Sequence, residues 1–179
     1  MRVVVTGGIA CGKSLFSRYL ELNGVETLDA DNIVHEIIPE EERKRIAREI
    51  FQDERKRKQL EARVHPIVKA RIDEFLSHAP NGVLRIAIVP LLFEVNWNGN
   101  FDIICCISST RENQIARMMK NRGYSEEEAL ARLAAQWPVE KKAKLADYVI
   151  RNDTTPEELE KETRKFLLWL MNLTSSHNL

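Results

Sequence analysis

The chain has 179 residues, a length that suits one domain with a sizeable core. Its 27 lysines and arginines balance its 27 aspartates and glutamates, so the formal net charge is zero. This balance excludes a global field that would attract nucleic acid or an anionic membrane surface, and any anion-binding site must be local.

Cysteine content and hydropathy indicate a reduced, intracellular protein. The three cysteines, Cys11, Cys105 and Cys106, are an odd number and lack the spacing of metal ligands. No apolar run approaches the roughly 20 residues needed to cross a bilayer. The sequence also enters strand-like residues directly, without a basic leader. We therefore expect a cytoplasmic protein with no membrane partner.

The first fourteen residues predict a phosphate-binding loop. An apolar run over residues 3–5 precedes Gly7, Gly12 follows after four residues, and Lys13 and Ser14 come next. This is the Walker A spacing in its strand-to-helix setting, where backbone N–H groups and the helix N-terminus bind anions. Lys13 is expected to follow the outer phosphates, and the Ser14 hydroxyl is expected to bind the Mg²⁺ that accompanies ATP. The residues expected around the nucleotide phosphates are Gly8, Ile9, Ala10, Cys11, Gly12, Lys13, Ser14 and Leu15.

Two carboxylates follow the next predicted strand. After a helix from Lys13 to Asn23, a short strand from Val25 to Leu28 delivers Asp29 and Asp31 at its C-terminal end. Open α/β sheets bind ligands at that edge. One carboxylate can face the cleft while the other caps the following helix, so we expect their roles to differ.

The next part of the chain is predicted to be helical. Charges of both signs alternate from Glu40 to Leu60, which favours a solvated helical face over a nucleic-acid site, since the latter needs an uncancelled basic footprint. His65-Pro66 suits a helix start, with proline in the first turn. The turn at residues 80–82 ends this helix.

Two buried strands occupy the middle of the sequence. Val83–Val89 is interrupted only by Arg85, as is typical of an interior parallel strand. Pro90 ends this strand, and Leu91–Glu94 follows at the ligand edge. Phe101–Ile107 is the second buried strand.

Two helices and their joint then carry several cations. A cap at residues 108–110 begins the first helix, a capping box at Ser125–Glu128 opens the second, and Trp137-Pro138 interrupts it. These helices can form a cover over the site, or a surface hairpin with solvated charges. The cations are Arg117, Arg122, Arg132, Lys141 and Lys142.

Five predicted strands alternating with helices give the fold class. Tyr148–Ile150 is the last strand, Asn152 lies just beyond it, and Thr155-Pro156 begins the last helix. This order predicts a three-layer α/β domain with a five-stranded parallel sheet, the P-loop NTPase arrangement.

The residues near the loop favour a phosphotransferase among P-loop proteins. Guanine-specific switches carry an Asn-Lys-x-Asp element, and Asn152-Asp153 lacks the lysine. Assembly ATPases place an acid at the end of a buried strand, where this chain has Pro90. The available carboxylates are therefore Asp29 and Asp31, as in small-molecule kinases whose acid orients an acceptor hydroxyl.

Several motifs together resemble the dephospho-coenzyme A kinase family over almost the whole chain. The resemblance implies transfer of the ATP γ-phosphoryl group to the ribose 3′-hydroxyl of dephospho-coenzyme A, in a nucleoside-monophosphate-kinase-like fold. The motifs are Thr6-Gly7-Gly8-Ile9, Gly12-Lys13-Ser14, Asp29-Ala30-Asp31, His65-Pro66, Val89-Pro90-Leu91-Leu92-Phe93-Glu94, Arg132 with Ala134-Ala135-Gln136, and Ala146-Asp147-Tyr148-Val149-Ile150 with Asn152.

The resemblance also implies roles for single residues. It makes Asp31 the acid beside the acceptor hydroxyl. Arg117 becomes the lid arginine that meets the transferring charge, and Arg132 a second lid cation. Lys13 keeps its role at the outer phosphates and is also catalytic. Asn152 lies near the adenine of ATP. The expected acceptor-binding residues are Asp31, His65, Pro90, Leu91, Leu92 and Glu94.

One kinase domain with three parts is expected: a core (1–33, 80–110 and 145–173), an acceptor-side helical insertion at about 34–79 and a lid at about 111–144. The insertion is shorter than is usual in the family, and Asn121-Arg122 stands where an arginine followed by an acid is common. Another small-molecule kinase, or a module that binds ATP without consuming it, would share the loop. We expect a monomer or a small homo-oligomer.

Overall fold

The computed structural model describes residues 1–42, 54–80 and 82–176, and most of the charged segment predicted between Glu40 and Leu60 lies outside them. A single parallel sheet has the strand order β2-β3-β1-β4-β5, with β1 at its centre. This confirms the predicted five-stranded parallel sheet. The strands are β1 (Val3–Gly7), β2 (Glu26–Asp29), β3 (Arg85–Ile88), β4 (Ile103–Ser108) and β5 (Tyr148–Arg151).

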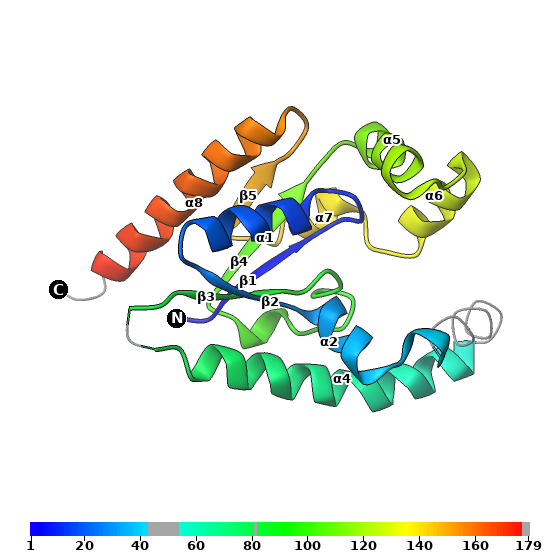
Figure 1. Ribbon diagram of the computed structural model, residues 1–179, viewed down its shortest axis with the longest axis horizontal. Coiled ribbons are helices and arrows are strands. Elements are labelled where there is room, and N and C mark those ends of the chain that lie inside the picture. Colours follow the sequence, from blue (N-terminus) through cyan, green and yellow to red (C-terminus); the bar gives the residue numbers. More distant parts are fainter. Residues whose placement is uncertain (43–53, 81, 177–179) are drawn as a thin grey trace.

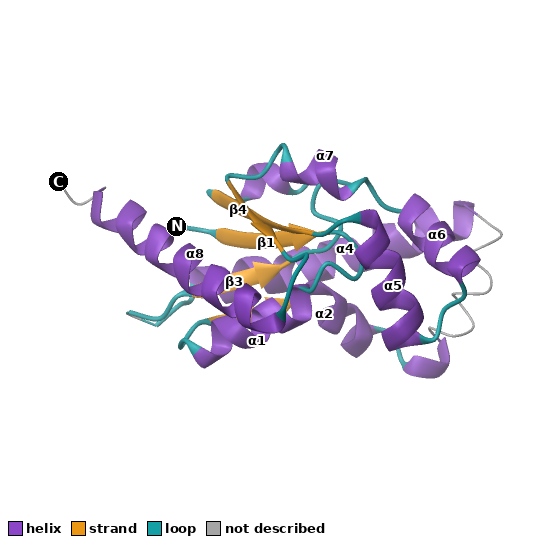
Figure 2. Ribbon diagram, turned by 90° about the horizontal axis from the view of Figure 1, so that it is seen from above, coloured by secondary structure: helices purple, strands orange, loops and turns teal. Residues whose placement is uncertain are grey.

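Helices cover both faces of the sheet and extend beyond one end of it (Figure 1). All parallel strands run toward the end where α5 and α6 lie, so the carboxyl ends of the strands face these two helices (Figure 2). The helices are α1 (Lys13–Leu22), α2 (Ala30–Ile37), α4 (Glu54–Ser77), α5 (Arg111–Arg122), α6 (Glu126–Ala134), α7 (Val139–Ala143) and α8 (Pro156–Ser176), with a 3₁₀ turn η1 (Asn98–Asn100).

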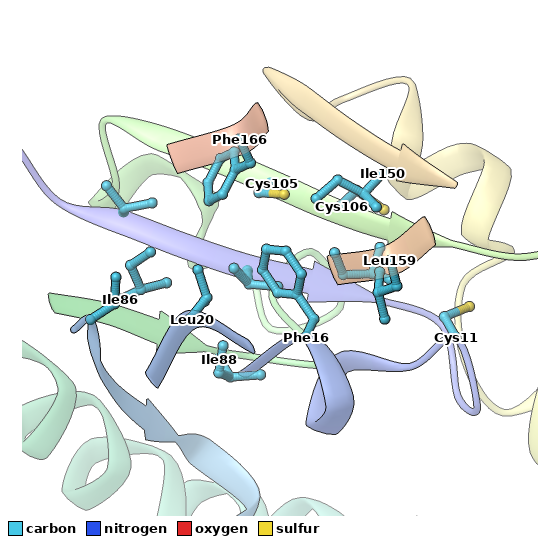
Figure 3. Close-up of a cluster of buried hydrophobic side chains, with 14 of the residues drawn as sticks. Cys11, Phe16, Leu20, Ile86, Ile88, Cys105, Cys106, Ile150, Leu159 and Phe166 are labelled. Carbon is cyan, nitrogen blue, oxygen red and sulfur yellow. The ribbon is translucent and has the colours of Figure 1, made fainter. Parts of the chain in front are cut away.

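The first core layer lies between the sheet and helices α1 and α8. Phe16 and Leu20 are four residues apart on α1 and fully buried, as the helical period requires. Phe166 of α8 packs against Phe16, with ring centroids 5.9 Å apart. Figure 3 shows both rings against the central strands. Cys105 and Cys106 are fully buried in this layer and serve as small core residues.

The second core layer joins the opposite face of the sheet to α2 and α4. Alternation along β1 places Val4 on this face, where it clusters with Val64, Val68 and Ile72 of α4. These three residues of α4 are four apart and almost completely buried. Helix α4 therefore covers this face of the sheet.

The prediction that His65-Pro66 starts a helix is wrong. Pro66 lies inside α4, which begins at Glu54. A proline inside a helix removes one backbone hydrogen bond, at a cost of about 3 kcal/mol. The continuous stripe of Val64, Val68 and Ile72 against the sheet offsets this cost, and the proline ring itself faces solvent.

Caps define the helices near the predicted lid. Thr110 accepts a hydrogen bond from Asn113 N–H at the start of α5. The predicted capping box is confirmed, since Ser125 and Glu128 each bond the other's backbone N–H. Across the described ranges, no helix is both long enough and apolar enough for a transmembrane span.

Candidate active site

The loop between β1 and α1 has the backbone of a phosphate cradle. Ala10 and Gly12 have left-handed φ angles of 57° and 100°, which produce the tight curvature. The Lys13 ammonium donates to the carbonyl oxygens of Gly7 at 3.0 Å and Gly8 at 2.8 Å, so it lies across the concave side of the loop. Burial lowers the pKa of Lys13, and a bound phosphate would oppose this shift by stabilising the charged ammonium.

A cavity of about 580 Å³ opens in front of this loop and brings most of the predicted site residues together. It lies at the carboxyl ends of the strands, where open α/β sheets bind ligands. Its volume falls within the range of ligand sites, roughly 300–1,000 Å³. It is lined by Ile9, Ala10, Gly12, Lys13, Ser14, Leu15, Asp29, Asp31, Pro90, Arg117, Asn121, Arg122, Gln136, Asn152, Thr154 and Pro156.

The two carboxylates after β2 divide their roles. Asp29 is the N-cap of α2, and its Oδ1 accepts a hydrogen bond from the Asp31 backbone N–H at 2.8 Å. Burial raises the pKa of Asp29, and the neighbouring Asp31 charge raises it further, whereas the backbone hydrogen bond opposes the shift. Asp31 is exposed in the first turn of α2 and borders the cavity. Asp31 is therefore the carboxylate of the two that is not used as a helix cap.

Arg117 extends from α5 to the rim of the loop. Its guanidinium donates to the carbonyl oxygens of Asn152 at 2.7 Å and Ala10 at 3.3 Å, and to the Ser109 hydroxyl at 3.1 Å. All of these partners are neutral, so the charge of the guanidinium is not neutralised by them. An anion at the loop can attract it without breaking an ion pair.

Asn152 supports the phosphate loop through a side-chain hydrogen bond. Its side-chain amide donates to the Cys11 carbonyl at 2.9 Å, and only 7% of the residue is exposed. A Cβ on Gly12 would come closer than 3.0 Å to the Asn152 amide nitrogen. The amide and the left-handed backbone therefore both require glycine at position 12.

Other predicted site residues do not line this cavity. Arg132 of α6 stacks over the Tyr124 ring, 4.1 Å from its centroid, whereas Arg122 lines the cavity together with Arg117. His65 packs edge-on against Trp97 with ring centroids 5.6 Å apart. Among the remaining predicted residues, Gly8, Cys11, Leu91, Leu92 and Glu94 are also outside the cavity lining.

Two glutamines hold the loop and were not singled out as site residues. Gln114 of α5 donates to the Ile9 carbonyl at 2.7 Å, and the Gln136 side-chain oxygen accepts from the Ile9 N–H at 3.1 Å. The N–H and the carbonyl of one loop residue, Ile9, are thus both bound by side chains of the predicted lid. The only sequence signal was the place of Gln136 beside Ala134-Ala135, because an isolated glutamine has no diagnostic spacing.

The oxygen donors at the cavity fit a magnesium ion that arrives with a nucleotide. Among the residues that the structure describes, no group of three or more His, Cys, Asp or Glu side chains could hold a metal. The cavity offers the Ser14 hydroxyl and the carboxylates of Asp29 and Asp31. Mg²⁺ takes oxygen ligands and usually keeps waters and phosphate oxygens, so this small donor set is suitable.

Sequence comparisons identify the relatives of this chain. A family model described as dephospho-CoA kinase matches residues 1–43 and 40–158. The dephospho-CoA kinase of Thermobifida fusca (strain YX) is 34% identical over 182 residues, covering 89% of this chain and 91% of the relative. That of Bdellovibrio bacteriovorus is 30% identical over 201 residues, covering 97% and 98%.

Solved structures share the fold. Dephospho-CoA kinase from Campylobacter jejuni aligns with a TM-score of 0.69 at 26% identity, covering 99% of this chain and 98% of that one. TT1252 from Thermus thermophilus aligns with a TM-score of 0.78 at 34% identity, covering 94% and 98%. Shikimate kinase from Acinetobacter baumannii has a TM-score of 0.62 at 17% identity, a likeness of fold alone.

Proposed function

This chain belongs to the dephospho-CoA kinase family, and we propose that Asp31 is the carboxylate that activates the acceptor hydroxyl in its reaction. The enzyme is an ATP-dependent phosphotransferase that acts on dephospho-CoA. The hydroxyl that receives the γ-phosphoryl group is the ribose 3′-hydroxyl.

One observation carries the role of Asp31. Its exposed carboxylate borders the same cavity as Lys13 and Ser14 of the phosphate loop, while its neighbour Asp29 is occupied as a helix cap. An acid placed beside a phosphate loop can accept the hydroxyl proton as the new P–O bond forms. The acceptor hydroxyl is thereby oriented for in-line attack.

Cations on the other side of the cavity complete the proposed mechanism. Lys13 would neutralise charge on the outer phosphates of ATP, and Arg117 would exchange its neutral hydrogen-bond partners for the oxygens of the transferring group. Arg122 lines the cavity and is therefore better placed than Arg132 to act as the second cation. Helices α5 and α6 would act as the lid over both substrates.

Magnesium and the remaining properties are part of the same proposal. Ser14 would hold Mg²⁺, which would supply positive charge beside the phosphate oxygens. Asn152 would lie beside the nucleotide, and Pro90 would border the acceptor. We further propose a cytoplasmic enzyme, monomeric or a small homo-oligomer, that does not bind nucleic acid.

The variant Asp31→Asn tests the central role. We expect kcat to fall by about 10²- to 10⁴-fold because the amide cannot accept the proton, while ATP affinity stays nearly intact. Glu36→Gln on the same helix, whose carboxylate pairs with Arg71, is the control that should retain turnover. An Asp31→Asn enzyme with normal kcat would remove this carboxylate from the mechanism.

A further inference from the structure

Lys142 of α7 is a buried cation to which the proposed mechanism assigns no role. Its side chain has no exposed surface, and it shares the inward face of α7 with Val139, which is 4% exposed. The ammonium donates to the Pro90 carbonyl at 2.8 Å and pairs with Glu94 Oε1 at 2.7 Å. Because an unpaired buried charge is strongly unfavourable, these two partners fix the position of Lys142.

Pro90 is part of the acceptor side of the cavity. It follows β3, and its carbonyl also accepts from the Thr6 hydroxyl at 3.3 Å, directly before the phosphate loop. Lys142 therefore binds the same carbonyl oxygen that accepts from the hydroxyl of Thr6, on the strand that leads into the phosphate cradle. The donor and acceptor sides of the cavity meet at this carbonyl.

Glu94 extends the connection to the predicted lid. Oε1, the oxygen that binds Lys142, also accepts from the Trp137 backbone N–H at 2.9 Å. The Trp137 indole stacks on Phe93, with centroids 6.2 Å apart and planes within 4°. Since Oε2 is buried without a hydrogen-bond partner among the described residues, Oε1 alone orients the carboxylate. Glu94 thus fastens the acceptor loop to the segment where the lid returns to the core.

The residue before Trp137 reaches the phosphate loop. Gln136 accepts from the Ile9 N–H, and both residues line the cavity. The segment Gln136-Trp137 is therefore attached to the donor loop by one residue and to Glu94 by the next. A shift of this segment would move the two sides of the cavity relative to each other.

We propose that Lys142 and Glu94 form a positioning pair for phosphoryl transfer. The pair rests on the proposed function, since it aligns the acceptor held near Pro90 with the ATP held by the loop. Neither side chain touches the reacting atoms, because neither lines the cavity. Misplacement of reacting groups by about 1 Å can cost about 100-fold in rate. The pair acts on kcat through this alignment.

The structure offers a matched ion pair at the opposite end of β3. Arg85 Nε bonds Glu26 at 2.6 Å, and the Arg85 guanidinium also donates to the carbonyl oxygens of Phe75 at 2.8 Å and His78 at 2.9 Å. Only 17% of the Arg85 side chain is exposed. This pair has the same kind of partners but lies away from the cavity, so it reports purely structural effects.

The test uses Lys142→Met, Glu94→Gln and the double variant that combines them. The control is the double variant that combines Arg85→Met and Glu26→Gln. Lys142→Met alone should lose stability because it leaves a buried carboxylate unpaired, and the double variant should recover part of that loss. At a temperature where all the proteins are folded, we expect the Lys142 and Glu94 double variant to keep its KM for ATP and to lose kcat about 10- to 100-fold. The control double variant should keep wild-type kcat.

Equal kcat in the two double variants would overturn the positioning role, because only stability would then depend on the pair. If Lys142→Met does not fold, Glu94→Gln alone decides: a lowered kcat supports the pair and an unchanged kcat overturns it. Asp31→Asn, measured alongside, separates the two proposals. A normal kcat in Asp31→Asn contradicts the role of Asp31, whereas the positioning pair is judged only against the Arg85 control.

Discussion

Replacing Gly12 by alanine should damage the phosphate loop more than its backbone angle alone explains. An alanine at φ 100° is strained by about 1–2 kcal/mol. The added Cβ would also overlap the Asn152 amide, whose hydrogen bond to the Cys11 carbonyl would be displaced at a further cost of about 1–3 kcal/mol. The free energy of unfolding should therefore fall by about 2–5 kcal/mol.

Gly24 provides the control for the backbone term. It lies just beyond the other end of α1, has φ 80°, and has no atom within 4 Å of an added Cβ. Gly24→Ala should therefore cost only the strain of about 1–2 kcal/mol. The difference between the two variants measures the overlap with Asn152.

Urea unfolding followed by circular dichroism gives both free energies, and calorimetric titration gives ATP affinity. A domain of this size loses about 2–4 °C in Tm for each kcal/mol. Gly12→Ala should also weaken ATP binding, whereas Gly24→Ala should not. In the background of Gly12→Ala, Asn152→Ala should cost less than it does alone, since the hydrogen bond to Cys11 is already displaced and the substitution removes the overlap. Equal losses for Gly12→Ala and Gly24→Ala would refute the reasoning.

Three further predictions concern charges and thiols. Arg117→Ala should lower kcat by about 100-fold or more, because a charge-stabilising donor at the cavity is lost. Arg132→Ala should change kcat little. A larger loss of kcat in Arg132→Ala than in Arg117→Ala, measured in steady-state assays, would contradict the placement of these arginines. Burial raises the pKa of all three cysteines, that of Cys106 to about 12, so a thiol reagent at pH 8 should modify none in the folded protein and all three in denaturant; rapid modification of the native protein would contradict this. Burial tends to raise the pKa of Asp153, but hydrogen bonds from Thr110, Ser109 and Asn113 outweigh it and hold the pKa below 3.8. Asp153 therefore stabilises the fold above that pH and loses its contribution as the pH falls through the folded value. Asp153→Asn lacks this contribution at every pH, so acid unfolding should begin at higher pH in Asp153→Asn than in the wild type, and coincident acid transitions would argue against it.

The donor side of the site was predictable because its signals are local. The run from Val3 to Ser14 contains the strand, the turn and the helix start in one stretch, and the structure has all three there. The division of labour between Asp29 and Asp31 was also foreseen as a possibility, since a residue before a helix is a natural cap. Which of them caps was decided by the strand, which ends at Asp29, one residue later than predicted.

The connections between distant segments were not predictable. Lys142 was grouped with the cations of a cover over the site or of a surface hairpin, yet it is fully buried against Glu94, 48 positions earlier. Its spacing of three residues from Val139 was the available signal, but a short helix gives little periodicity to interpret. Pro66 was predicted at a helix start but lies inside α4, because tertiary packing of the residues around it outweighs the local preference of proline for the first turn.

The uniform direction of the strands has a practical consequence for handling the enzyme. All five strands run toward the cavity, so Met1 and the carboxyl end of α8 lie at the other end of the molecule (Figure 1). A purification tag or carrier protein joined at Met1 would extend away from the cavity. Enzyme attached to a resin or sensor surface by that end would present its cavity to the solution.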